Sequence, residues 1–426
     1  MQQISHPAAR AAIGLFLGLT CCSQAWSQTA DVSSQIAELR AEQAQIAELQ
    51  RRNEEKLQRL EALLAAQAPS IAAKAPNAPL VTAAPSAADT QPRLAVGGDL
   101  RLRTQGDYAN SARDRESGQL RARLGATFAL NDTVSLGARL VTGDADDPNS
   151  TDVQLSNFDD DLQVSFDLAY AQLNFGDLKI YGGKIPQPFA RSDLVWDGDV
   201  NPQGASATYR HAFANGSAFR TNGLLFIVDE RAAASDSTMV GAQVGYDTAV
   251  FGHWKFDASA AYYDYRLGSI AGGDSGDFRS NLLDANGNYL SDFNLADLLV
   301  GATWAGAGPR WPLRILGDYV RNTGARTDED SGFGVDLTVG RASQPRDWRV
   351  TYGYSVAETD SVLAAFSNDN IALGTNYRLQ ALTFDFVPSP KTLLSAIWYH
   401  YQPYHVASTA DDSWIDRLRL MFLMNF

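Results

Sequence analysis

The chain has 426 residues, a formal net charge of −14 and only 20% charged residues. A nucleic-acid-binding protein would carry a basic stripe, so this composition argues against a nucleic-acid partner. The only cysteines are Cys21 and Cys22, which excludes a disulfide framework and a thiolate metal site from the rest of the chain.

Residues 1–27 have the features of a secretory signal peptide. Arg10 supplies the positive charge, an apolar run follows at 11–20, and residues 25–27 form a cleavage site of the small-residue type. We therefore expect an exported chain whose mature form starts directly after this site. Acylation at Cys22 is the alternative interpretation of the same segment, and it also predicts export.

Residues 28–68 are predicted to contain a periplasmic coiled-coil helix. Apolar residues occupy heptad positions a and d from Val32 to Leu64, among residues with high helix propensity. Three polar residues on the same seam weaken it, and a single amphipathic helix lying on a surface is the alternative. Residues 69–92 hold five prolines among alanines and predict an extended, semi-rigid linker.

Residues 93–426 follow a different pattern, in which apolar and polar residues alternate over stretches of about ten residues. Strands with one apolar and one polar face are typical of a transmembrane β-barrel, whereas a soluble sandwich has shorter strands. No later apolar run reaches the length of a spanning helix, so a membrane-spanning form would be a closed barrel.

Connection lengths also favour the barrel, because tight turns alternate with long connections, as expected for its two ends. We expect an all-β, 16-stranded antiparallel barrel whose first and last strands pair. Aromatic residues near strand ends, such as Tyr262 to Tyr265 and Trp398 to Tyr401, would form interfacial girdles. The expected strands are 94–105, 119–130, 133–142, 164–175, 178–185, 204–213, 217–228, 238–249, 253–266, 296–305, 311–322, 332–342, 346–358, 372–387, 391–402 and 413–426.

The last predicted strand is amphipathic and ends in Phe426. This ending resembles the assembly signal of Gram-negative outer-membrane barrels, which implies the barrel assembly machinery as a partner. Four segments carry a further resemblance: GGKIPQPF, LVWDGDVNPQGA, DWRVTYGYSVAETDSVLAAFSNDN and GTNYRLQALTFDF. They are similar to the putative porins of proteobacterial outer membranes. The resemblance covers about residues 93–426 and implies a water-filled barrel for passive uptake of small solutes, with no particular solute and no known binding residue.

Side-chain parity points basic residues into the lumen, opposite their outward apolar neighbours. Because closure makes the last strand a neighbour of the first, most of these arginines would lie side by side. A solvated polar face, with some arginines only holding loop carboxylates, is the alternative. The candidates for a pore-lining basic wall are Arg101, Arg103, Arg121, Arg123, Arg139, Arg417 and Arg419.

Residues 186–203 form the third long connection, and Pro186 and Pro188 end the strand before it. We expect it to fold inward, as the third loop of general porins does, with Phe189 and Trp196 as anchors. Its charges would face the basic wall and produce a transverse field. The predicted constriction residues are Lys184, Arg191, Asp193, Asp197 and Asp199. Lys184 would point inward only if residues 182–183 form a bulge.

Together these features predict an outer-membrane porin, as a homotrimer among lipid and lipopolysaccharide, for passive diffusion of small hydrophilic solutes or ions. A substrate-selective channel for a phosphate, carboxylate or sugar acid is one alternative. A structural barrel tethered by its coil is another. We expect no enzyme, cofactor or metal site, because catalytic motifs are missing, His400 has no evident triad partners, and the acidic stretches at 143–163 and 284–288 lack the Ca²⁺-loop pattern.

Overall fold

The computed structural model describes Arg51 and residues 93–426, except 110–112, 144–149, 157–161, 233–234, 269–279 and 407–412. The chain divides into two units, Met1–Asp89 and Thr90–Phe426. The predicted signal peptide, coiled coil and linker lie outside the described residues, apart from Arg51, and remain predictions. Within the described residues, no helix is long and apolar enough to cross a membrane.

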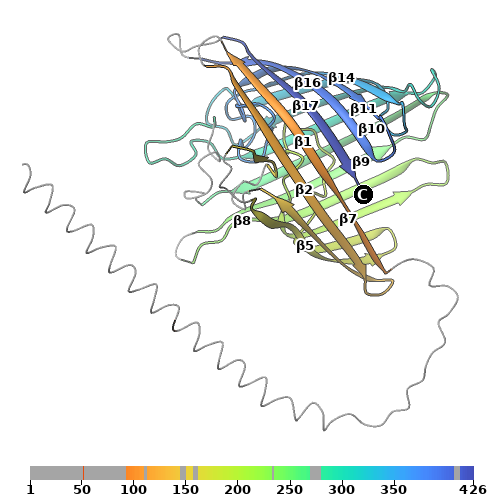
Figure 1. Ribbon diagram of the computed structural model, residues 1–426. Coiled ribbons are helices and arrows are strands. Elements are labelled where there is room, and N and C mark those ends of the chain that lie inside the picture. The colour runs from red at the N-terminus through yellow and green to blue at the C-terminus, as the bar shows by residue number, and fades with distance from the viewer. Residues whose placement is uncertain are drawn as a thin grey trace, which may run out of the picture. The chain divides into compact units, whose positions relative to one another are not determined.

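Residues from 93 onward form one antiparallel sheet that closes into a barrel, as Figure 1 shows. The sheet has 17 strands, but β4 has two residues and pairs only with β2, so the barrel wall is 16-stranded, as predicted. Each wall strand pairs with the next, and β17 pairs with β1. The strands are β1 (Leu94–Ala109), β2 (Arg115–Ala129), β3 (Val134–Thr142), β4 (Val153–Gln154), β5 (Val164–Phe175), β6 (Leu178–Lys184), β7 (Gln203–Ala212), β8 (Ala218–Asp229), β9 (Ser237–Asp247), β10 (Trp254–Arg266), β11 (Asn294–Trp304), β12 (Leu313–Asn322), β13 (Ser331–Gly340), β14 (Trp348–Ala357), β15 (Tyr377–Phe386), β16 (Thr392–Pro403) and β17 (Ile415–Asn425).

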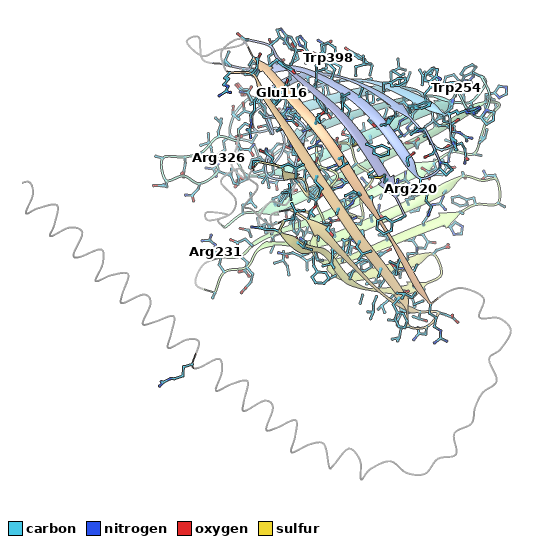
Figure 2. The ribbon with its side chains drawn as sticks, viewed as in Figure 1. Glu116, Arg220, Arg231, Trp254, Arg326 and Trp398 are labelled. Atoms are coloured by element: carbon cyan, nitrogen blue, oxygen red, sulfur yellow. The ribbon has the colours of Figure 1, made fainter. Side chains whose placement is uncertain are left out.

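The connections separate into two classes at opposite ends of the barrel. Short turns occupy one end, and Gly216 in one of them has a φ of 87°, a left-handed value that glycine adopts readily. Figure 2 places Arg231 and Arg326 at the end with the long connections, and Arg220 and Trp254 toward the end with the short turns. This arrangement confirms the expected alternation of short turns and long connections.

The two faces of the wall differ as parity predicts. Outward side chains such as Leu124, Leu418 and Leu420 are apolar and exposed, with Leu420 at 64%. Inward side chains on the same strands, such as Arg121 and Arg419, are polar and buried. An apolar exterior around a polar interior is the reverse of a soluble protein and suits a barrel in lipid.

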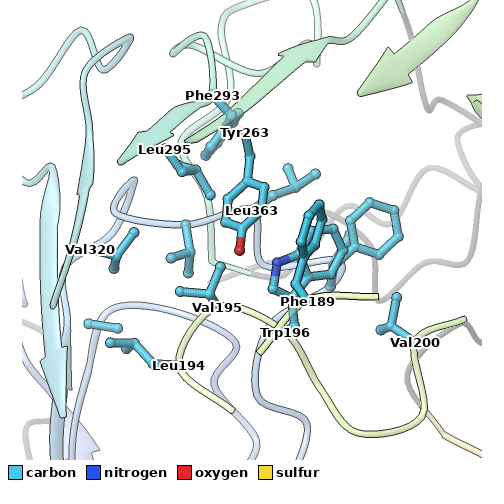
Figure 3. Close-up of a cluster of buried hydrophobic side chains, with 14 of the residues drawn as sticks. Phe189, Leu194, Val195, Trp196, Val200, Tyr263, Phe293, Leu295, Val320 and Leu363 are labelled. Carbon is cyan, nitrogen blue, oxygen red and sulfur yellow. The ribbon is translucent and has the colours of Figure 1, made fainter. Parts of the chain in front are cut away.

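Two long connections pack against the inner face of the wall. We call residues 185–202 loop L3 and residues 358–376 loop L7. Both contribute buried apolar side chains to one hydrophobic cluster, which also includes Tyr263 and Leu295 of the wall. Figure 3 shows this cluster around Trp196 of L3.

The inward position of L7 was not predicted, and it explains two differences from expectation. The strand expected to begin at 372 begins at Tyr377, because the preceding residues belong to L7. Four tyrosines expected in interfacial girdles instead face inward and are buried, because alternate residues of a strand point to opposite faces. These inward residues are Tyr263, Tyr265, Tyr399 and Tyr401.

Closure generates the first prediction, since the end of the chain lies against Gly98. The Phe426 nitrogen donates to the Gly98 oxygen at 3.1 Å. A Cβ atom at Gly98 would lie 2.1 Å from the Arg123 oxygen and 2.5 Å from Phe426 Cζ. Gly98→Ala should therefore destabilise the closed barrel by about 1–3 kcal/mol through overpacking.

Heat-modified mobility in SDS gels, followed over a urea series, measures this loss. Gly223→Ala is the matched control, because a Cβ atom there meets nothing within 4 Å. Equal urea midpoints for Gly98→Ala and Gly223→Ala would contradict the close packing at the seam.

Candidate functional site

The arginines predicted to line the pore lie on four adjacent strands. Arg101 of β1 stands opposite Arg121 of β2 in the strand register. Arg417 and Arg419 of β17 stand opposite Asp107 and Gln105 of β1. Arg139 follows on β3. We refer to Arg101, Arg103, Arg121, Arg123, Arg139, Arg417 and Arg419 together as the basic wall.

Two aspartates, one on the barrel wall and one in L3, form ion pairs with Arg121 and Arg123 of the basic wall. Asp99 of β1 contacts Arg121 at 3.0 Å and Arg123 at 2.7 Å. Asp199 of L3 lies 3.4 Å from Arg123 and 3.8 Å from Arg121. Two adjacent guanidinium groups repel each other, and carboxylates on both sides compensate that repulsion.

Asp152 is the carboxylate partner of the two basic-wall arginines on β1. It contacts Arg101 at 2.6 Å and Arg103 at 2.5 Å, and its side chain is buried. The sequence analysis did not pair this acidic stretch with the basic wall. The short strand β4 pairs with β2 and draws residues 150–156 onto the wall. Because β4 is only two residues long, its alternation of side chains is too short to be recognised in the sequence.

A second group of charged residues lies near the end of β6, where L3 begins. It consists of Lys184 of β6, Arg139 of β3 and Asp167 of β5. Arg139 Nε donates to Asp167 Oδ1 at 2.9 Å. Lys184 Nζ donates to the Asn201 carbonyl oxygen at 3.2 Å, so the lysine holds the far end of L3. Strand pairing runs through Gly182 and Gly183 without a register shift, so the bulge considered for Lys184 is absent.

Asn370 of L7 connects the basic wall with L3. Its carbonyl oxygen accepts from Arg417 Nη1 at 2.8 Å, and its side-chain oxygen accepts from Arg419 Nη1 at 2.8 Å. Its Nδ2 donates to Asp193 Oδ2 at 3.2 Å. Asn370 ends one of the segments that carry the family resemblance, but the resemblance assigned it no role, because its contacts depend on the unpredicted inward fold of L7.

The predicted anchors Phe189 and Trp196 are buried in the cluster of Figure 3. The Trp196 ring lies 5.6 Å from Tyr263 and stacks on Phe366 of L7 at 5.9 Å. The Asp197 nitrogen donates to the Phe366 oxygen at 2.8 Å, so backbone and side chains both join the two loops. L3 and L7 therefore form one packed body.

The remaining predicted loop charges have different surroundings. Arg191 Nη1 donates to the Trp196 oxygen at 2.9 Å and lies 3.5 Å from Asp193, so it braces the loop from within. Asp197 is buried, and burial, together with the nearby Asp369 carboxyl, raises the pKa of Asp197 to about 9. Among the three predicted loop aspartates, Asp199 alone contacts the basic wall in the described structure.

His400 lies on the outer face of β16, away from the lumen. Its Nδ1 lies 2.8 Å from Asp416 Oδ1, and its ring stacks on Trp414 at 4.1 Å. A carboxylate therefore does stand beside His400, contrary to the sequence interpretation. No serine hydroxyl hydrogen-bonds to this histidine in the part of the chain that the structure describes.

Comparisons with known proteins support the barrel fold. Residues 83–286 match the model of a family described as "Putative porin". The chain therefore resembles this porin family over slightly less than half of its length. No curated protein matches the sequence.

Among solved structures, the chain is similar to OprB of Pseudomonas putida, with a TM-score of 0.54 and 12% identity over 78% of this chain and 94% of that one. OmpF of Salmonella typhi in complex with daunomycin gives a TM-score of 0.49 and 13% identity over 78% and 97% of the two chains. OmpT of Vibrio cholerae in its trimer form gives 0.47 and 10% identity over 78% and 99%. The likeness to OprB shows the barrel fold alone.

The packing of L3 generates the second prediction. Trp196→Ala should remove about 3–5 kcal/mol of packing from the loop cluster and release L3 from L7. Limited trypsin digestion of the folded protein, with mass spectrometry of the fragments, should show faster cleavage after Arg191. Trp254→Ala is the control, because Trp254 is 40% exposed on the outer face. Equal cleavage rates in the two variants would show that Trp196 does not hold the loop.

Proposed function

We propose that this porin forms a water-filled channel in the Gram-negative outer membrane, through which small hydrophilic solutes or ions diffuse passively. The observation that carries the proposal is the position of Asp199 in L3, which contacts Arg121 and Arg123 on the inner face of the closed barrel. These ion pairs hold L3 against the inner wall, where it would narrow the lumen and give it a polar lining. The long connections would face the outside of the cell and the N-terminal coiled coil the periplasm.

The charges of this passage suggest how solutes are selected. The guanidinium groups of the basic wall and the carboxyl groups paired with them would give the lining of the passage fixed charges. Polar solutes can replace lost water contacts with these fixed charges, whereas apolar solutes cannot. Because each guanidinium offers five donors, an ion or sugar-sized solute could exchange contacts step by step along the wall.

A substrate-selective anion channel is the second candidate, and one observation favours it. Arg419 contacts Gln105 Oε1 at 2.7 Å and Asn370, and the described residues place no carboxylate within 4.0 Å of it. Arg419 is therefore a buried cation with neutral partners, and a phosphate, carboxylate or sugar acid that displaced Asn370 could pair with it. Because L3 and L7 fill part of the lumen, a structural, non-conducting barrel is the third candidate.

Assembly partners follow from the same proposal. A homotrimer in contact with outer-membrane lipid and lipopolysaccharide would cover the apolar exterior of the wall. The barrel assembly machinery would recognise Phe426 at the end of β17 before the barrel closes.

Planar-bilayer recording tests the channel and the role of the basic wall. Arg121→Ala/Arg123→Ala removes two positive charges from the passage, so the reversal potential in a salt gradient should shift toward cation preference by severalfold in permeability ratio. Arg266→Ala is the control, because that side chain is 75% exposed at the end with the long connections. An unchanged reversal potential would overturn the role of the wall, and a complete lack of conductance would overturn the channel.

A further inference from the structure

The outer face of the barrel carries a groove of about 780 Å³ that crosses β15, β16, β17, β1 and β2. We call it the outer groove. Its outward lining combines small side chains with large apolar ones, among them Thr104, Gly106, Ala396, Phe384, Leu418 and Leu420. Figure 2 labels Trp398 and Glu116, which also line it. Its volume is within the range of about 300–1,000 Å³ that is usual for ligand sites.

At the level of this groove the outer face changes from apolar to polar. One apolar row crosses three strands, because Leu382 of β15 pairs with Trp398 of β16, which pairs with Leu418 of β17. The next outward row toward the long connections is polar and consists of Gln380, His400 and Asp416. On a barrel in lipid, such a boundary marks the level at which hydrocarbon tails give way to head groups.

Arg378 lies one outward position beyond this polar row, on β15. Its sequence neighbours Tyr377 and Leu379 belong to the inner cluster, so alternation directs Arg378 outward. Its guanidinium carbon lies 5.2 Å from the centre of the Tyr404 ring. Among the described residues, the Arg378 side chain makes no hydrogen bond and no ion pair, and its Nε is buried without a partner. A guanidinium group has five N–H donors, so this cation can accept an anion from outside the chain.

The acidic side chains on this part of the outer face are placed away from Arg378. Asp416 accepts a hydrogen bond from Trp398 Nε1 at 2.7 Å, and it lies 2.8 Å from His400 Nδ1. Glu116 lines the groove from β2, at the side farthest from β15. An anionic ligand on this face would therefore place its charge at the β15 side, beside Arg378.

A lipid that carries a phosphate combines the two groups that this face can bind. Guanidinium groups bind phosphate through paired, charge-assisted hydrogen bonds, and the apolar lining of the groove would contact an acyl chain. Arg378 and Leu382 lie about 13 Å apart along their strand, a separation that a head-group linker and the long arginine side chain would span. A second copy of the chain would need a carboxylate and an apolar side chain at matching positions, whereas one lipid molecule carries both groups.

We propose that the outer face of β15 to β17 binds a phosphate-bearing lipid, with the phosphate on Arg378 and an acyl chain in the outer groove. The site goes beyond the proposed channel. It rests on the membrane location in the proposed function, because the groove would then face lipid, and it is independent of conduction.

Native mass spectrometry of the purified full-length protein measures the binding of three probes: dioleoyl phosphatidate, dioleoylglycerol and inorganic phosphate. Phosphatidate should bind about tenfold more tightly than dioleoylglycerol, because it adds a charged hydrogen bond, and Arg378→Gln should remove this difference. Inorganic phosphate should bind more weakly than phosphatidate, because it leaves the groove empty. Arg266→Gln is the matched control, because Arg266 lies at the same end of the barrel and is already 3.3 Å from Asp264.

A second variant tests the groove separately from the charge. Ala396→Trp fills the outer groove, so it should weaken the binding of both dioleoyl lipids severalfold and keep the preference for phosphatidate. Ala260→Trp is the control, because Ala260 is exposed on the outer face of β10 and does not line the groove.

Equal phosphatidate affinities of the wild type and Arg378→Gln, or of Ala396→Trp and Ala260→Trp, would overturn the lipid site. Inorganic phosphate that binds as tightly as phosphatidate would do the same. If Ala396→Trp separates an oligomer into monomers and leaves lipid binding unchanged, the groove belongs to a second copy and the lipid site is wrong. A protein that binds phosphatidate through Arg378 but conducts no current in planar bilayers contradicts the channel and supports the lipid site. A conducting protein that binds phosphatidate and dioleoylglycerol equally contradicts the lipid site alone.

Discussion

β17 pairs with β1 from Asn425 opposite Asp99 to Ile415 opposite Ala109, and this pairing leaves the sheet without a free edge. In a lipid environment each unpaired backbone group costs about several kcal/mol, so closure is what allows this chain to span a membrane with strands. Closure also creates the functional interior. It brings Arg417 and Arg419 beside the arginines of β1 and β2, although more than 290 residues separate them in sequence. The basic wall therefore depends on the seam.

Two requirements shape the interior of the barrel: counter-charges for the arginines and packing for the loops. Adjacent guanidinium groups need carboxylates, and these come from the wall at Asp99, from β4 at Asp152 and from L3 at Asp199. A long polar connection inside a barrel needs packing, and Trp196 and Phe366 supply it where L3 meets L7. The apolar cluster thus fixes the loops on one side of the lumen, and ion pairs hold the other side.

The barrel itself could be predicted from the sequence because its determinants are local. Alternation sets the strands and their facing, and turn glycines and connection lengths set their order, so even the inward parity of Arg121 and Arg419 followed. L7, Asn370 and Asp152 could not be predicted in the same way. Their positions depend on contacts between segments distant in sequence, such as Asn370 with Arg417. The inward tyrosines at 263 and 399 were misassigned because an aromatic near a strand end suits an interfacial girdle and a packed lumen equally well.

The central claim is that solutes pass directly beside the basic wall, and a charge-rescue measurement at position 123 tests it most directly. The two cysteines precede the predicted cleavage site, so Arg123→Cys in the mature chain would carry a single thiol. A cationic thiosulfonate reagent added to the open channel should restore the wild-type reversal potential, and an anionic reagent should shift it further toward cations. Thr104→Cys, whose neighbour in the register is the outward Leu420, should respond to neither. Identical reversal potentials after the two reagents at position 123 would contradict a conducting path along the basic wall.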